Sequence, residues 1–156
     1  MTSKKDFTDE EWTRIRRAPL VAGVAISLAD TGGPIEVAKE TMATLRSATL
    51  PPSQEELLTS VALDVQALAQ HRQNPLGDFK PRGGQQVLEE LKAVNGLVTA
   101  KATPQEAEAF RGWLVAAAQA AADAAKEGGF LGFGAELVSA GEKQMLEQVR
   151  AALRVA

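Results

Sequence analysis

The sequence contains no cysteine and only one histidine. The first absence excludes disulfide bonds and thiolate metal sites, and the second excludes a zinc site made of several histidines. Basic residues are not in excess, since the chain has 17 Lys and Arg and 20 Asp and Glu, for a net charge of −3. A general nucleic-acid binder is expected to be basic, so this charge balance disfavours that function. The most apolar stretches, residues 20–29 and 113–125, are too short to span a bilayer. We therefore expect a cytoplasmic protein without a membrane span and without a nucleic-acid partner.

Signals for the start of a helix recur along the chain. At several places a Ser or Thr precedes a Glu by three residues, the capping-box pattern in which hydroxyl and carboxylate accept from free N–H groups of a first helical turn. The four pairs are Thr8 with Glu11, Ser53 with Glu56, Thr103 with Glu106, and Ser139 with Glu142. No segment shows the sustained alternation of polar and β-branched residues that is typical of a strand. The sequence therefore predicts an all-α fold.

The expected architecture is a compact single-domain bundle of about seven helices over residues 1–156, with residues 1–7 as a flexible N-terminus. The helices are predicted at residues 9–17, 19–30, 34–47, 54–71, 84–100, 104–126 and 140–154. Pro19 is expected to divide the first two, because proline removes a backbone donor and crowds the preceding turn. The segment 71–84 contains two prolines and three glycines and is predicted to be a surface loop.

The helix predicted at residues 104–126 shows its buried face plainly. Ala107, Phe110, Leu114, Ala117, Ala118, Ala121 and Ala125 recur at steps of three and four residues. A stripe so rich in alanine allows a neighbouring helix to approach closely, which indicates a central helix of the bundle. Trp113 flanks the stripe and is expected to cover one edge of the core.

Two glycine-containing turns resemble each other. The sequence reads ADTGG at residues 29–33 and AKEGG at residues 125–129, and each turn follows an alanine-rich apolar helix and precedes an amphipathic one. This similarity predicts two helix hairpins related by a pseudo-two-fold axis. The second hairpin carries an additional FLGFGAE segment, in which Phe130, Leu131 and Phe133 are too apolar for a freely solvated loop. We expect this segment either to fold back onto the bundle or to be buried between two copies of the chain.

The same pattern occurs twice: an alanine-rich helix ends in an acidic, glycine-containing turn and leads to a helix with an acid in its first turn. This repeated pattern resembles the TerB-like (tellurite-resistance protein B) family. The residues that carry the resemblance are Ala29, Asp30, Thr31 and Gly32 with Glu36 and Glu40, and Ala125, Lys126, Glu127 and Gly128 with Ser139 and Glu142. The resemblance implies a bundle of about seven helices that is cytoplasmic and not known to be enzymatic. It also implies an association with metal and oxyanion stress, and divalent-metal binding through inward-facing acids.

Five acidic residues of the two hairpins are candidate ligands for a divalent cation. Asp30, Glu36 and Glu40 belong to the first hairpin, and Glu127 and Glu142 belong to the second. Their carboxylate oxygens suit hard cations such as Ca²⁺, Mg²⁺ or Mn²⁺. A local structural role is the alternative, because a negative charge in the first turn of a helix interacts favourably with the helix dipole.

An enzyme is not expected, and one that uses the glycine-rich loop at residues 128–134 is the third and least favoured alternative. His71 is expected at a helix C-terminus, where its side chain meets unpaired carbonyls, and no residue beside it has nucleophile–base spacing. Arg14, Arg16 and Arg17 are expected on a solvated helix face, with phosphate contact as the alternative. The first predicted function is therefore that of a TerB-like, stress-associated protein that binds a divalent cation. The second is that of a non-catalytic protein–protein interaction domain that acts as a homodimer.

Overall fold

The computed structural model describes residues 2–29, 34–126 and 140–154, without the side chains of 34–36, 125 and 126. All the regular secondary structure of these residues is helical. They are the 3₁₀ helix η1 (Lys4–Asp6) and the α-helices α1 (Asp9–Ala29), α2 (Pro34–Thr49), α3 (Glu56–Gln70), α4 (Gly84–Lys101), α5 (Pro104–Lys126) and α6 (Ala140–Ala152). The prediction of an all-α bundle is confirmed for this part of the chain. The described α-helices number six, however, and not about seven.

The difference in number arises at Pro19, which lies inside α1 and does not divide it. Proline removes the hydrogen bond to the carbonyl four residues earlier and costs about 3 kcal/mol in a helix interior. On both sides of Pro19, α1 buries large apolar side chains, and Ile15, Val21 and Ile26 are completely buried. Each such burial contributes about 1.5–3 kcal/mol, which exceeds the proline penalty. The predicted split was wrong because packing against the rest of the bundle outweighs the local preference.

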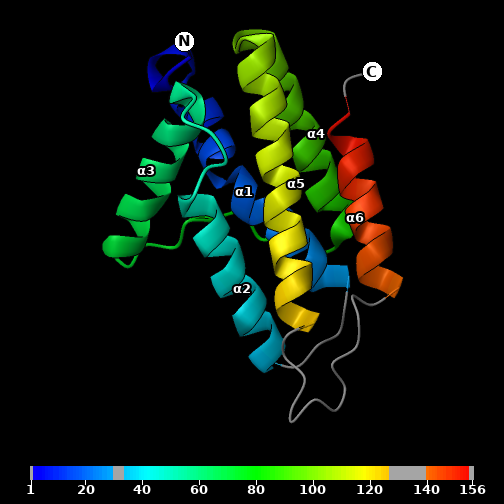
Figure 1. Cartoon of the computed structure of the whole chain (residues 1–156). Helices are drawn as coiled ribbons and strands as arrows, with labels where there is room; N and C mark the ends of the chain where they lie inside the picture. The colour runs from blue at the N-terminus through cyan, green and yellow to red at the C-terminus, as the bar shows by residue number, and fades with distance from the viewer. Residues whose placement is uncertain (1, 30–33, 127–139, 155–156) are drawn as a thin grey trace.

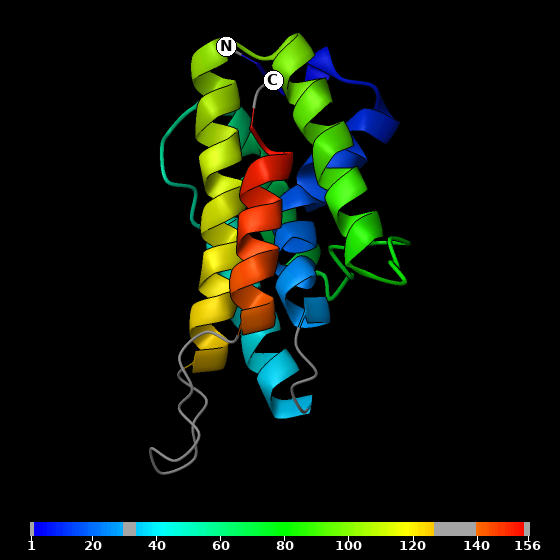
Figure 2. The same ribbon diagram turned by 90° about the vertical axis from the view of Figure 1, so that its right-hand side faces the viewer.

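Two helices organise the bundle, because α1 and α5 each pack against every other α-helix. Figure 2 shows α6 lying against α1, between α5 and α4, and Figure 1 shows α2 on the other side of α5. The ends of α1 and α5 and the starts of α2 and α6 all lie at the lower end of the bundle in both views. The four helix ends that flank the two glycine-containing turns therefore lie at the same end of the bundle. No described helix has both the length and the apolar content needed to cross a membrane.

The apolar face predicted for α5 is buried as expected. Its members with described side chains, which are Ala107, Phe110, Leu114, Ala117, Ala118 and Ala121, are at most 2% exposed. Trp113 is also buried, and its indole Nε1–H donates to the carbonyl of Ser47 at 2.8 Å. This bond attaches α5 to the last turn of α2. The small side chains of α5 thus bring the helices close together, and one tryptophan fixes α2 against them.

The helix-start signals were only partly correct. Thr8 and Glu11 form a complete capping box, with Glu11 N–H donating to Thr8 Oγ1 at 3.1 Å and Thr8 N–H donating to Glu11 Oε1 at 2.9 Å. The box predicted at Ser53 was wrong, because α3 begins at Glu56 with Glu55 as its N-cap, and the Ser53 hydroxyl is buried without a hydrogen-bond partner among the described residues. The serine of the last predicted box, Ser139, lies outside the described residues.

The start of the chain packs onto the bundle over residues 2–7, where the sequence predicts a flexible segment. Thr2 and Phe7 are 4% and 8% exposed. The Thr2 N–H donates to both carboxylate oxygens of Glu106, at 3.0 and 3.1 Å, and the Phe7 ring lies 6.0 Å from that of Trp12. The carboxylate of Glu106 thus joins α5 to the start of the chain, while its backbone N–H is capped by Thr103 at 3.1 Å.

Candidate functional site

The second half of α1 approaches α2 unusually closely at Gly23. A Cβ atom placed on Gly23 would lie 2.2 Å from Oγ1 and 2.3 Å from Cγ2 of Thr44, far inside van der Waals contact. The Thr44 hydroxyl donates to the carbonyl of Glu40 at 2.7 Å, so it is held in place within its own helix. Only glycine fits at position 23 with this helix separation.

One helical turn from that contact, a half-buried serine of α1 meets a buried glutamate of α2. Ser27 follows Gly23 by four residues on α1, and Glu40 precedes Thr44 by four residues on α2, as expected for antiparallel helices in register. The Ser27 hydroxyl donates to Oε2 of Glu40 at 2.5 Å, and Glu40 is 2% exposed. The close approach at Gly23 therefore sets the distance at which Ser27 meets the carboxylate.

A small cavity lies beside this pair. Its volume is about 60 Å³, and its lining comprises Leu20, Gly23, Val24, Ser27, Thr41, Thr44 and Leu76. A space of this size can hold water molecules next to a polar group, but it is much smaller than a pocket for an organic ligand. The cavity beside Ser27 is therefore large enough for water, and Glu40 is not part of its lining.

The start of α6 meets the last turn of α1 in a second close contact. A Cβ atom on Gly141 would lie 2.8 Å from the carbonyl oxygen of Ala29. The next residue, Glu142, is 2% exposed and is one of the largest fully buried side chains of the described residues. Two carboxylates distant in sequence, Glu40 and Glu142, thus come from helices that both pack against the last turns of α1.

The predicted metal ligands divide into two groups. Glu40 and Glu142 are described and buried, whereas Asp30 and Glu127 and the side chain of Glu36 lie outside the described part of the structure. Within that part, no group of three or more Asp, Glu or His side chains could hold a metal ion. The structure therefore places two of the five predicted ligands. The apolar segment around Phe130 and Phe133, predicted in the core or in a dimer interface, also lies outside the described residues.

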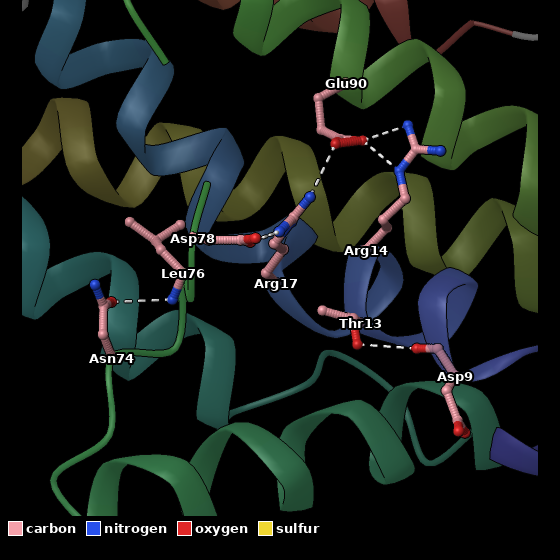
Figure 3. Close-up of polar contacts among 8 residues, drawn as sticks. All are labelled: Asp9, Thr13, Arg14, Arg17, Asn74, Leu76, Asp78 and Glu90. Atoms are coloured by element: carbon pink, nitrogen blue, oxygen red, sulfur yellow. Dashed lines mark hydrogen bonds and ion pairs between the residues drawn. The ribbon is translucent and has the colours of Figure 1, made fainter. Parts of the chain in front are cut away.

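The first half of α1 contains a different charged cluster, shown in Figure 3. Arg14 Nε donates to Glu90 Oε1 at 2.7 Å, and Arg17 Nη2 donates to Glu90 Oε2 at 3.3 Å. The side chains of Arg17 and Glu90 are only 12% and 10% exposed. Because Glu90 of α4 compensates both guanidinium groups, the cluster joins two helices, and the alternative of phosphate contact by these arginines loses its support. The sequence predicted a solvated face here and gave no signal for Glu90, 76 residues beyond Arg14.

Arg17 also contacts the connection between α3 and α4. The loop predicted at residues 71–84 is confirmed over most of its length, because α3 ends at Gln70 and α4 begins at Gly84. Arg17 Nη1 lies 3.4 Å from Asp78 Oδ1, and its guanidinium stacks over the Phe79 ring at 5.0 Å from the centroid. Within the loop, the Leu76 N–H donates to Asn74 Oδ1 at 3.0 Å, as Figure 3 shows. Leu76 is thereby placed in the lining of the cavity beside Ser27.

Comparison with protein-family models, with curated proteins and with solved structures gives no match. The likeness to TerB-like proteins therefore depends on the sequence motifs around the two hairpins. The sequence patterns identified Glu40 and Glu142 as candidates but not Gly23, Ser27 and Thr44, which position Glu40. A glycine and a serine four residues apart in an apolar helix were the available signal, because small residues on one helix face indicate close helix packing.

Proposed function

We propose that this protein is a TerB-like helical module that binds a divalent cation, Ca²⁺, Mg²⁺ or Mn²⁺, where the last turns of α1 meet α2 and α6. The observation that carries the proposal is that two carboxylates, Glu40 of α2 and Glu142 of α6, are each 2% exposed on helices that both pack against α1. Carboxylate oxygens contributed by separate elements are the ligands that a hard cation takes in proteins.

In this proposal Glu40 and Glu142 are direct ligands, and Asp30, Glu36 and Glu127 are the further ligands that the sequence predicts. Oxygen ligands of this kind suit hard cations better than softer transition metals. Ser27 orients Glu40 from behind through its hydroxyl, as outer-shell groups do in metal sites. From the TerB resemblance we also propose that the two hairpins are related by a pseudo-two-fold axis. We further propose that the protein is not catalytic and acts in the stress response of the cytoplasm.

Thermal unfolding tests the proposal directly. The protein is stripped with EDTA and melted in the presence of Mn²⁺, Ca²⁺ or Mg²⁺, and calorimetric titration gives the affinity. A ligand that binds only the native state adds about 2.7 kcal/mol at a free concentration one hundred times Kd. We expect one of these ions to raise the Tm, and Glu40→Gln and Glu142→Gln each to remove most of the rise.

The matched control is Glu108→Gln, which removes the same charge from an exposed position on α5. It is expected to keep the metal-dependent rise in Tm. The proposal is contradicted if none of the three ions binds at submillimolar concentration, or if both buried variants keep the wild-type response.

A further inference from the structure

The large apolar side chains that are exposed in the described part of the molecule concentrate on α2, α3 and their connection. Val37, Met42, Leu50 and Leu63 are 39%, 59%, 65% and 59% exposed, and the remaining one, Leu28 of α1, is 43% exposed. Single exposed apolar residues are ordinary on a protein surface, so those that adjoin a groove are the ones to consider as a binding surface.

One of these side chains, Met42, lines a groove between α2 and α3, where α3 diverges from α2 in Figure 1. The groove encloses about 390 Å³ and is lined by Met42, Leu45, Arg46 and Thr49 of α2 and by Gln66, Ala69 and Gln70 of α3. Leu63 precedes Gln66 by three residues and Gln70 by seven, so it extends the same face of α3. The apolar part of the groove is therefore formed by Met42 and Leu45 of α2 and Ala69 of α3, and Leu63 lies beyond its lining on the same face of α3.

The α2 edge of the groove is positively charged. Lys39 and Arg46 are seven residues apart and share one face of α2 with Met42. Both are exposed, neither forms an ion pair with a described residue, and no acidic residue lines the groove. This edge is cationic on a chain whose net charge is −3, so its sign is a local property of the surface.

We propose that the groove binds an amphipathic helix of a partner protein, whose apolar stripe enters between α2 and α3 and whose flanking acidic residues face Lys39 and Arg46. Two diverging helices with an apolar floor accept a third helix in the way that helix-in-groove receptors do. A second copy of this chain fits less well, because a two-fold interface brings the same surface against itself and would place these cations in like-charge surroundings. The proposal is independent of the cation site.

The test uses a fluorescein-labelled helical peptide of Leu, Ala and Glu, with Leu on one stripe and Glu beside it, and a counterpart in which every Glu is Lys. Fluorescence anisotropy measures binding, and ¹³C-methyl NMR of the methionines locates it. The acidic peptide is expected to bind at least about tenfold more tightly than the basic one. It should shift the methyl signal of Met42 and leave that of Met145, which lies on α6, unchanged.

Variants of exposed residues then assign the contacts. Replacing Met42 and Leu63 together by Ser should weaken binding of the acidic peptide about tenfold or more. Arg46→Glu should reduce or reverse the preference for the acidic peptide. The control is Leu28→Ser, because Leu28 is an exposed apolar residue on α1 that does not line the groove. The proposal is overturned if neither peptide binds, if both bind equally, or if sedimentation velocity shows a dimer that the Met42 and Leu63 changes abolish.

Discussion

The two halves of α1, on either side of Pro19, are held to the bundle in different ways. In the first half charges are matched, since Arg14 and Arg17 share Glu90 across the interface with α4. In the second half the contacts depend on small residues, since Gly23 lies against Thr44 of α2 and Ala29 lies against Gly141 of α6. An ion pair across the interface therefore positions the first half, and close backbone approach positions the second. The proposed cation site lies beside the second half, where Glu40 of α2 and Glu142 of α6 are buried.

The largest effect should come from removing the shared acid of the first half. Glu90→Gln keeps the side-chain shape but removes the counter-charge of Arg14 and leaves Arg17 only the exposed Asp78, 3.4 Å away. We expect the free energy of unfolding to fall by about 3 kcal/mol, measured by urea denaturation, with or without metal. Glu89→Gln, at the exposed neighbouring position, should change it by less than about 0.5 kcal/mol. Equal effects of the two changes would show that the cluster contributes nothing beyond a surface charge.

The next largest effect should come from the close approach in the second half. Gly23→Ala forces α1 and α2 apart, and we expect a loss of about 1–3 kcal/mol in the free energy of unfolding. Gly96→Ala is the matched control, because a Cβ atom there meets nothing within 4 Å. It lies inside α4 and should stabilise the protein by about 0.5–1 kcal/mol. If both changes stabilise the protein, the contact between Gly23 and Thr44 is not a constraint.

A smaller effect is expected at the hydroxyl that orients Glu40. If the proposed cation binds, Ser27→Ala should lower its affinity about tenfold, which corresponds to about 1.4 kcal/mol, and isothermal calorimetry measures it. Thr13→Ala removes a hydroxyl from the first half of α1, where Oγ1 donates to the carbonyl of Asp9 at 2.9 Å, and should leave the affinity unchanged. An unchanged affinity in Ser27→Ala would separate this serine from the cation site.

The smallest effect concerns the N-terminal cap of α1. The Lys101 ammonium, 2.7 Å from Glu11 Oε1, lowers the pKa of Glu11 below 4.5, and the backbone N–H of Thr8 lowers it further. A lowered pKa means that the ionised carboxylate stabilises the fold above pH 4.5 and that this contribution is lost as the pH falls through the lowered pKa. Lys101→Met should raise the pKa of Glu11, as followed by NMR titration of its carboxyl carbon. An unchanged titration would assign the shift to the Thr8 cap alone.

Those parts of the fold that depend on neighbours in sequence could be predicted. The cap at Thr8 and the apolar stripe of α5 are both readable within a few turns of helix. Pro19 could not be interpreted in the same way, because its local penalty is outweighed by burial against helices far along the chain. The ion pair of Arg14 with Glu90 could not be predicted either, because the two residues are 76 positions apart in the sequence.

The candidate site was predictable only in part. Acidic residues near the two turns identified Glu40 and Glu142, but their burial depends on how α2 and α6 meet α1, which no local pattern specifies. The residues that fix this meeting, Gly23 and Gly141, have no side chain that would mark them as functional. Their role becomes visible only when the helix separation is known.

The position of α1 and α5, each touching every other α-helix, has a consequence for how the molecule opens. No peripheral helix can detach without exposing part of one of these two, and neither of these can detach without exposing all the others. Amide protons in the middle of both helices, such as those of Val21 and Leu114, should therefore exchange with solvent only through global unfolding. Their protection factors should be equal, and each should report the stability of the whole molecule.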